Sequence, residues 1–237
     1  MKLSLQYPLK YISVNQSFGQ NATDVYSKAG MKGHSGIDFY APHGTPIYAT
    51  HDGVAQYQIG NDKGHGVIIV TNEKYEYKDT EVYFKTVSWH MVDFTREPQY
   101  KSPIADKTGF VKVKTGDLIG YADNTGNSTG SHLHFELKPV EGEFGFWKNI
   151  EQLNGYYGAI DPKPYLPQQP IEEFKKIMKL GDENSDVQKL QAFFLRTNRM
   201  KPILKGFGYY GKSTQEAVKQ FQVDNGIPHN NGVQVGK

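Results

Sequence analysis

Two histidines separated by a single leucine, His132 and His134, directly follow a turn-rich loop in the stretch GSHLHFEL. Side chains two positions apart on a β-strand point to the same face, so an extended chain would aim both imidazoles one way. Imidazole is the commonest metal ligand in proteins and also an ordinary polar surface group. The pair therefore predicts either a metal or catalytic centre, or a solvated strand face.

A second chemical context is GHSGIDFYAP, where His34 and Asp38 are four positions apart. In an extended chain these two side chains share a face. Histidine and aspartate are both good zinc ligands. The flanking Gly33 and Gly36 allow the backbone to approach another group closely. Taken by itself, this spacing is common and does not identify a site.

The third context is VSWHM, in which His90 ends a hydrophobic stretch. A catalytic zinc site needs three nitrogen or oxygen ligands and an open position for water. Further histidines beside it could orient that water or move its proton. The three contexts together supply such a set: His34, Asp38, His90, His132 and His134. The set suits metal-assisted hydrolysis, but spacing alone does not say which histidine is a ligand and which is a base.

The segments that must position these residues read as β-strands up to about Leu166. Runs rich in Val, Ile, Tyr and Phe alternate with turn residues, as in TPIYAT, GVAQYQIG, GVIIVTN, EVYFKTVSWH and HLHFELKPV. No helical periodicity of useful length occurs there, and parallel sheets need long crossover connections. The sequence predicts a mainly β, antiparallel-sheet catalytic domain over residues 1–166.

A proline-rich stretch then ends the β pattern. Four prolines between Pro162 and Pro170 predict an exposed linker over residues 167–178. Helical patterns follow and predict a small all-α domain over residues 179–237.

The two expected helices have recognisable start signals and apolar faces. SDVQKLQAFFLRTN offers Ser185 or Asp186 as the cap, and KSTQEAVKQFQVDNGI offers Ser213 or Thr214, with Asn225-Gly226 as its stop. Residues at helical spacing form the expected apolar faces: Val187, Leu190, Phe193, Phe194, Ala217, Val218 and Phe221.

Composition limits the partners and the setting. The absence of cysteine excludes disulfides and thiolate zinc ligands. A net charge of +2 gives no argument for nucleic acid, and no apolar run is long enough to span a bilayer. The first residues do not form a secretory signal peptide. We expect a monomer with no nucleic-acid or membrane partner.

At this point the motifs resemble a known family. GHSGIDFYAPHGTPIYATHDGVA, the WHM at His90, and VKTGDLIGYADNTGNSTGSHLHFEL are similar to the lysostaphin/LytM-type zinc endopeptidases (the M23 group) of bacterial cell walls. The similarity covers most of residues 15–166, and IDPKPYL is similar to that family's usual end.

The resemblance implies a role for each residue. His34, Asp38 and His134 would be the zinc ligands. His90 and His132 would be the catalytic histidines that polarise the water and stabilise the charged intermediate. The implied cofactor is Zn²⁺, and the implied reaction is hydrolysis of a peptide bond in peptidoglycan, with the bond and the substrate-binding residues left open.

Several positions depart from the family pattern. Ser131 replaces a usual proline, and Trp89 and Val92 flank His90 in place of smaller residues. Residues 93–111 look longer than the usual link and are expected to form part of the substrate groove. His65 is either a groove residue or a packed or solvent-exposed one.

Other polar residues keep open interpretations. Glu136 shares strand parity with His132 and His134, so it would either orient a ligand or form a cross-strand salt bridge. The remaining histidines are expected to be structural or solvated: His43, His51 and His229.

The C-terminal segment carries a second resemblance. KLGDENSDVQKLQAFF and GYYGKSTQEAVKQFQVDNGI are similar to the small helical peptidoglycan-binding domain of wall hydrolases. Such a domain has three helices, and the sequence ends at GVQVGK where the third would begin. We expect either a truncated domain or a different closure, a partly covered apolar face, and lower stability than in the first domain. The alternative is a helical hairpin without a ligand of its own.

Two other functions remain alternatives. One is a catalytically silent wall-binding or amidase-activating protein on the same scaffold, although such proteins typically lose a ligand. The other is a cupin-like metal protein, which would leave the His34/Asp38 context unexplained. The favoured enzyme would act at the bacterial cell wall, as a phage endolysin or as a processed secreted protein.

Overall fold

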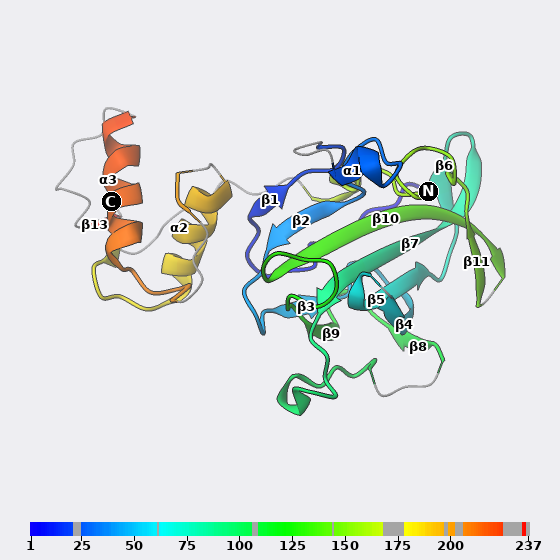
Figure 1. Cartoon of the computed structure of the whole chain (residues 1–237), viewed down its shortest axis with the longest axis horizontal. Helices are drawn as coiled ribbons and strands as arrows, with labels where there is room; N and C mark the ends of the chain where they lie inside the picture. Colours follow the sequence, from blue (N-terminus) through cyan, green and yellow to red (C-terminus); the bar gives the residue numbers. More distant parts are fainter. Residues whose placement is uncertain are drawn as a thin grey trace. The chain divides into compact units, whose positions relative to one another are not determined.

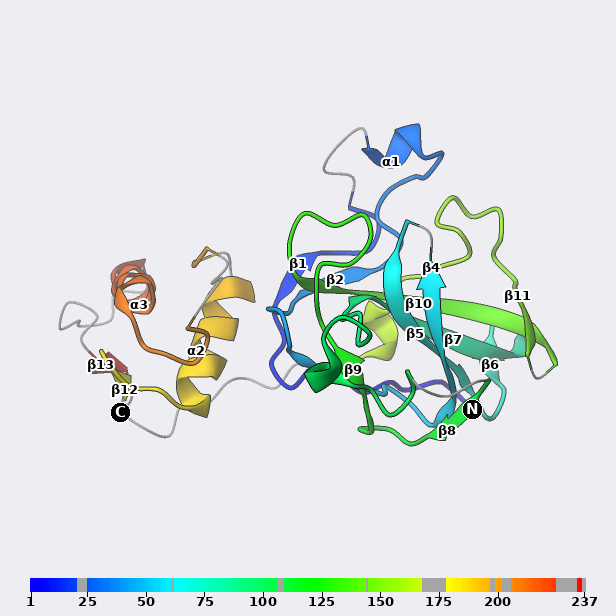
Figure 2. The same ribbon diagram turned by 60° about the horizontal axis from the view of Figure 1, so that its bottom comes forward.

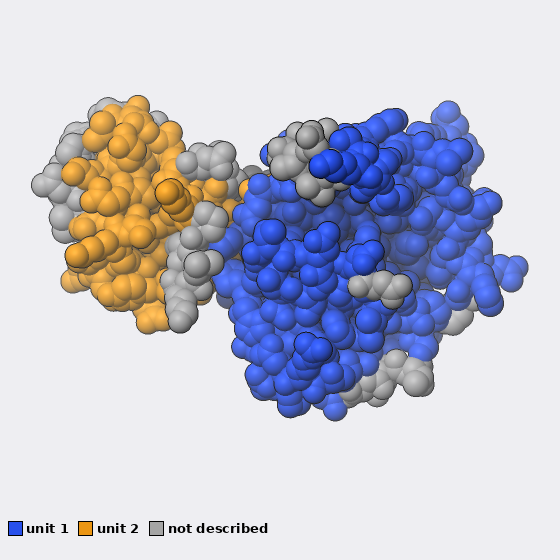
Figure 3. All heavy atoms as spheres, viewed as in Figure 1, with its two compact units in different colours: residues 1–10, 15–167 blue, residues 11–14, 168–237 orange. Residues whose placement is uncertain are grey.

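The computed structural model describes residues 1–20, 25–60, 62–105, 109–143, 145–167, 178–196, 199–201, 206–224 and 234–235. The chain divides into two compact units, residues 1–10 with 15–167 and residues 11–14 with 168–237 (Figure 3). Most of the predicted linker, residues 167–178, lies outside the described residues. The predicted limits 1–166 and 179–237 stay predictions.

The first unit is built on a nine-stranded sheet with the main path β1-β2-β10-β7-β5-β4-β8 (Figure 1). The bounds along that path are β1 (Val14–Gln16), β2 (Ile37–Tyr40), β10 (His132–Glu143), β7 (Thr80–Met91), β5 (Gly64–Thr71), β4 (Gly53–Gly60) and β8 (Val111–Val113). Every pair from β2 to β8 is antiparallel. The predicted antiparallel β architecture is confirmed.

Shorter elements complete this unit. β11 (Phe146–Asn149) pairs with β10, β6 (Tyr75–Tyr77) pairs with β7, and β3 (Pro46–Tyr48) pairs with β9 (Leu118–Tyr121). The helical pieces are short: α1 (Val25–Lys28) and the 3₁₀ turns η1 (Pro98–Tyr100) and η2 (Lys163–Tyr165).

Strand β10 shows how the sequence separates core from site. Leu133, Phe135 and Leu137 are completely or almost completely buried on one face. The intervening His132, His134 and Glu136 point to the other face, as the two-residue period requires. Figures 1 and 2 both show β10 beside β7 in the middle of the sheet. The buried side chains of β10 anchor the strand in the core, and this anchoring holds the site residues on its other face in place.

The second unit contains the two predicted helices, α2 (Ser185–Arg196) and α3 (Lys212–Asp224). It also contains a feature that was not predicted, the antiparallel pair of β12 (Met178–Lys179) and β13 (Gln234–Val235). The core of this unit is one apolar cluster: Met178, Val187, Leu190, Phe194, Tyr210, Ala217 and Val218. The expectation of a partly covered face is therefore wrong for its main residues, because Met178 and Tyr210 pack against it.

The helix caps also differ from the predicted ones. Asn184 caps α2, since its Oδ1 accepts hydrogen bonds from the backbone of Asp186 and Val187 at 2.9 and 3.0 Å. Thr214 lies inside α3, where its hydroxyl accepts from Gln191 Nε2 at 2.8 Å. The Thr214 hydroxyl, which the sequence suggested as a helix cap, is therefore bonded to the buried Gln191 side chain. The predicted stop at Asn225-Gly226 lies outside the described residues.

Among the helices of the described residues, none combines the length and the apolar character needed to cross a membrane.

Candidate metal and catalytic site

The site lies where three neighbouring strands, β2, β10 and β7, run side by side. His134 on β10 is the register partner of Asp38 on β2 and of Trp89 on β7. His90 is next to Trp89 near the end of β7. Strand pairing therefore brings residues 38, 90 and 134 together although they are far apart in the sequence.

Gly36 allows β2 to start close to β10. A Cβ at this position would overlap the carbonyl oxygen of Phe135 and lie 3.0 Å from Cε1 of His134. The absence of a side chain lets the chain turn from His34 into β2 directly against the site. This is the close approach predicted for the flanking glycines.

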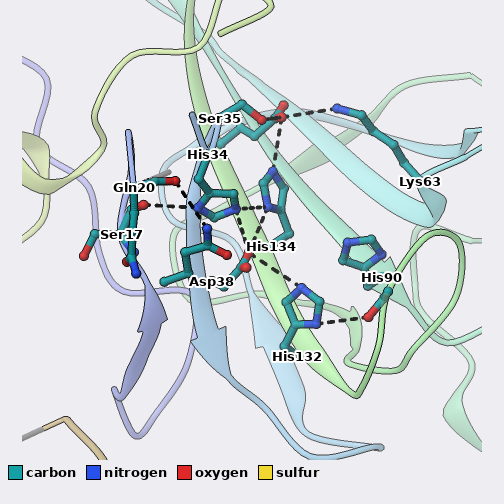
Figure 4. Close-up of polar contacts among 12 residues, drawn as sticks. Ser17, Gln20, His34, Ser35, Asp38, Lys63, His90, His132 and His134 are labelled. Atoms are coloured by element: carbon teal, nitrogen blue, oxygen red, sulfur yellow. Dashed lines mark hydrogen bonds and ion pairs between the residues drawn. The ribbon is translucent and has the colours of Figure 1, made fainter. Parts of the chain in front are cut away.

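Three donor atoms converge here: His34 Nε2, Asp38 Oδ1 and His134 Nδ1. Their separations are 2.9 Å between the two nitrogens, 2.9 Å from His134 to Asp38 and 3.1 Å from His34 to Asp38 (Figure 4). Ligand atoms on a tetrahedral zinc with bonds of about 2.1 Å are about 3.4 Å apart. A small expansion of this triangle would hold such an ion, so the donor set fits a metal.

The two histidines of this triangle are each fixed by the ring nitrogen that faces away from it. His34 Nδ1 lies 3.2 Å from the carbonyl oxygen of Ser17, and His134 Nε2 lies 3.2 Å from Oε1 of Glu136. With an N–H donated outward, the other nitrogen faces the centre and offers its lone pair once any proton on it is lost. Metal-binding histidines are commonly oriented in this way.

Glu136 is fully buried and contacts the ligand candidate His134, but its ion pairs run to its own strand and to a turn, not across to a neighbouring strand. Its Oε1 accepts from Ser35 Oγ at 2.9 Å and contacts His134. It also forms ion pairs with Lys138 at 2.9 Å and Lys63 at 3.3 Å. The residue is thus both a partner of His134 and the centre of a salt-bridge network.

Burial, hydrogen bonds and neighbouring charges shift the pKa values of Asp38 and His134. Burial alone would raise the pKa of Asp38, but hydrogen bonds and charge from His134 and His34 hold that pKa well below its usual range. Burial alone would lower the pKa of His134, yet hydrogen bonds to Asp38 and Glu136 raise it to about 9. Without a metal, His134 is therefore an imidazolium between two carboxylates.

His90 has an unusual backbone and a fixed ring. Its φ of 61° lies in the left-handed region, which costs a non-glycine residue about 1 kcal/mol or more. Its Nδ1 donates to the carbonyl oxygen of Thr125 at 2.7 Å, which leaves Nε2 unprotonated. Burial lowers the pKa of His90 to about 4, with the bond to Thr125 opposing the shift. The ring is neutral at pH 7.

His132 faces the same space from β10. Its Nδ1 donates to the carbonyl oxygen of Gly130 at 2.7 Å, and its Nε2 lies 3.6 Å from Oδ1 of Asp38. The rings of His90 and His132 are 4.7 Å apart between centroids. The structure thus brings all five predicted residues into one cluster, with three donor atoms forming a triangle and two imidazoles beside it.

A pocket of about 540 Å³ contains this cluster. Its other lining residues are Gln16, Tyr26, Met31, Ser35, Asp62, Lys63, Trp89, Asn127, Ser128, Thr129 and Tyr157. Sequence reasoning missed most of these wall residues because they come from separate loops. Only the turn-rich character of the loop before His132 pointed to some of them.

The segment 93–111 and His65, which the sequence raised as candidates for the groove, do not line this pocket over their described residues. No described residue between 93 and 111 lines the pocket, so a part for this insertion in the substrate groove stays a prediction. Tyr100 instead packs on Tyr121 and His43. His65 does not line the pocket either, since its ring contacts the Tyr57 hydroxyl and lies 3.6 Å from Asp93.

The other departures and histidines have structural partners. Ser131 donates to the carbonyl oxygen of Ala41 at 2.9 Å, which secures the start of β10 without a proline. His51 is buried against Thr86. His43 is exposed and contacts Asp123 and Glu97 with opposite ring nitrogens, which is the geometry of an ion pair. His229 lies outside the described residues.

Comparisons with known proteins agree with the resemblance seen in the motifs. Residues 183–233 match the family described as "Putative peptidoglycan binding domain". The DD-carboxypeptidase/endopeptidase Mpg of Neisseria meningitidis serogroup B is 28% identical over 131 residues, which cover 55% of this chain and 25% of Mpg. The peptidoglycan DD-endopeptidase ShyC of Vibrio cholerae is 33% identical over 138 residues, which cover 57% of this chain and 27% of ShyC.

The chain thus spans about a quarter of the length of these curated relatives. Among solved structures, the catalytic domain of lysostaphin from Staphylococcus simulans aligns over 65% of this chain and 91% of that domain, with 22% identity and a TM-score of 0.45. The predicted resemblance to peptidoglycan endopeptidases, with a peptidoglycan-binding domain at the C-terminal end, is confirmed at the level of sequence similarity.

Proposed function

We propose that this protein is a zinc-dependent endopeptidase that hydrolyses peptide bonds in bacterial peptidoglycan. The observation that carries the proposal is the triangle of His34 Nε2, Asp38 Oδ1 and His134 Nδ1, with all three atoms within 3.1 Å of one another. Two further imidazoles stand beside it in the same pocket. The similarity to peptidoglycan endopeptidases supports the substrate.

Three side chains would hold the ion, and the donor set supports zinc. Two neutral imidazoles and one carboxylate are typical of catalytic sites that keep a position open for water, as opposed to closed structural sites. Zinc bound there would lower the pKa of its water to near neutrality and polarise the scissile carbonyl group.

We assign the proton transfers to the two remaining histidines. His90 supports the role of base, because its ring is neutral at pH 7 and its Nε2 carries the lone pair. The proton of the attacking water would pass to that atom. His132, in its protonated form, would donate from Nε2 to the substrate oxygen that gains charge, and then protonate the leaving nitrogen.

The second unit supports an anchoring role. We propose that it holds the enzyme on peptidoglycan, since residues 183–233 match a peptidoglycan-binding family. Activity would then be confined to the cell wall, whether the protein is released as a phage endolysin or secreted and processed. The names of the relatives favour a cross-link between stem peptides over a polyglycine bridge.

The test combines metal content with product analysis. Zinc per chain is measured for the wild type and for His134→Ala, and purified peptidoglycan digests are followed by mass spectrometry. We expect about one zinc and new peptide termini for the wild type, and loss of both in the variant. His65→Ala, which changes a histidine that neither lines the pocket nor belongs to a group able to hold a metal, is the matched control and should keep both.

The main alternative gives the opposite result. A catalytically silent wall-binding protein would bind peptidoglycan and leave the muropeptides intact even when loaded with zinc. That outcome would overturn the proposed reaction and leave only the binding role.

A further inference from the structure

Lys63 is the one lysine or arginine that lines the pocket within the part of the chain that the structure describes. It lies in the turn between β4 and β5, which end and begin at Gly60 and Gly64. Its side chain is 40% exposed, so its charge remains accessible from the pocket. Figure 4 shows its amino end directed toward the side of the metal-ligand group where Ser35 lies, away from His132.

The position of the Lys63 amino group is fixed from two sides. Nζ lies 3.3 Å from Oε1 of Glu136, whose oxygen also contacts His134. Nζ also lies 5.8 Å from the centroid of the Trp89 ring, a favourable position for a cation. One carboxylate and one imidazole thus separate this ammonium group from the metal-facing nitrogen of His134.

The negative charge of Glu136 is balanced by Lys138, so the positive charge of Lys63 is not neutralised. The buried Lys138 already pairs with the other oxygen of Glu136 at 2.9 Å. The lining residues include two acids, Asp38 and the exposed Asp62. A divalent ion would neutralise Asp38 and add one positive charge, which offsets Asp62. Lys63 therefore makes the loaded pocket cationic.

We infer that Lys63 binds a free carboxylate that the substrate carries beside the scissile bond. This inference rests on the proposed function and specifies its substrate class. The contacts that link Nζ to His134 through Glu136 are 3.3 and 3.2 Å long, and an extended peptide advances about 3.3–3.6 Å per residue, so a carboxylate on a residue beside the scissile bond would be within reach of Nζ. A stem peptide with an acidic residue there would be preferred, whereas a bridge made of glycine carries no such group.

The experiment uses two synthetic cross-linked peptides that differ in one group. One carries a free carboxylate on the residue beside the scissile bond, and its twin carries a carboxamide there. The ratio of their kcat/KM values is measured for zinc-loaded wild type, Lys63→Gln and Lys63→Arg. Because a ratio is used, a general loss of activity in a variant does not affect the result.

We expect the wild type to prefer the carboxylate peptide about tenfold, as one charge-assisted hydrogen bond predicts. Lys63→Gln should bring the ratio close to one, and Lys63→Arg should keep most of it. The preference should decrease with added salt. Binding of both peptides to zinc-loaded His132→Ala, measured by calorimetry, should show the same preference without turnover.

The failures are distinguishable. If the wild type cleaves neither peptide nor peptidoglycan, the proposed function fails. If it cleaves both peptides equally, or if Lys63→Gln keeps the wild-type ratio, the endopeptidase remains and the role of Lys63 is overturned.

Discussion

Asp38 and His134 are register partners across the β2–β10 ladder, and their side chains meet with Oδ1 2.9 Å from Nδ1. The backbone pairing of two core strands thus sets the distance between two donor atoms of the candidate metal centre. A ligand set fixed by a ladder needs little rearrangement to accept an ion, which is the arrangement that a precise catalytic centre requires.

The division of labour between the two histidines of HLH is the first prediction. His134→Ala should lose zinc and activity together, because it removes a corner of the donor triangle. His132→Ala should keep most of the zinc and lose about 10²–10⁴-fold in kcat, as expected for removal of an acid–base group. Metal analysis and peptide hydrolysis on the same samples check both. Equal loss of metal in the two variants would show that the assignment of roles is wrong.

Metal binding should release a proton. His134 has a pKa of about 9 in the metal-free protein, so it is protonated at pH 7 and must lose that proton to bind a metal through Nδ1. The apparent zinc affinity should therefore rise about tenfold per pH unit between pH 6 and 8 and level off above pH 9. Calorimetry in buffers of different ionisation enthalpy should count about one proton. A pH-independent affinity would contradict an imidazolium at this position.

Glu136→Gln should weaken metal binding and also destabilise the fold, because it leaves the buried Lys138 without its carboxylate partner. The change keeps the size of the side chain but removes the charge that orients His134 through its Nε2. Loss of such a partner typically costs 10–100-fold in metal affinity. Competition with a chelator measures this loss, and circular dichroism verifies folding. Glu141→Gln, at an exposed position of the same strand, is the matched control and should bind zinc like the wild type.

His51 should make the protein sensitive to mild acid. Burial lowers its pKa to about 4, against an ordinary value of 6.5. Between these values the unfolded chain binds a proton that the folded chain does not, so stability falls as the pH falls. The loss from His51 approaches the order of 3 kcal/mol near pH 4 and is absent above about pH 7.

Denaturant unfolding at several pH values tests this contribution. His51→Gln cannot titrate, so its free energy of unfolding should depend less on pH between 4 and 6.5 than that of the wild type, even if it is lower throughout. Burial alone would lower the pKa of His43, but hydrogen bonds and charge from Asp123 and Glu97 outweigh it and raise that pKa, so His43→Gln should change the pH profile in the opposite direction. Parallel pH profiles for wild type and His51→Gln would assign the acid sensitivity to other groups.

The strands and the site cluster could be predicted because each depends on a local signal. The alternation of Leu133, Phe135 and Leu137 with polar residues marks both the strand and its buried face. The same alternation aims His132 and His134 to one side. The spacing of the histidines could not show which of them bind the metal and which act as acid or base. Those roles depend on the pairing of β2 with β10, which places Asp38 beside His134.

Other features depend on tertiary contacts that no local sequence pattern indicates. The path of residues 93–105 is set by packing of Tyr100 on His43 and Tyr121, and nothing in the spacing of these residues shows it. Asn184 caps α2 although Ser185 and Asp186 are equally good capping residues. Lys63 reaches the pocket from a turn whose sequence indicates only a reversal of the chain.

The ligand triangle also constrains how the protein becomes active. His34 and His134 are 100 positions apart in the chain and meet only after β2 has paired with β10. Contacts of such long range form late and slowly in folding. A chain that is still emerging from the ribosome, or that is threaded unfolded through a membrane, has no assembled metal centre. The topology therefore delays assembly of the candidate metal centre until β10 has been made and has paired with β2.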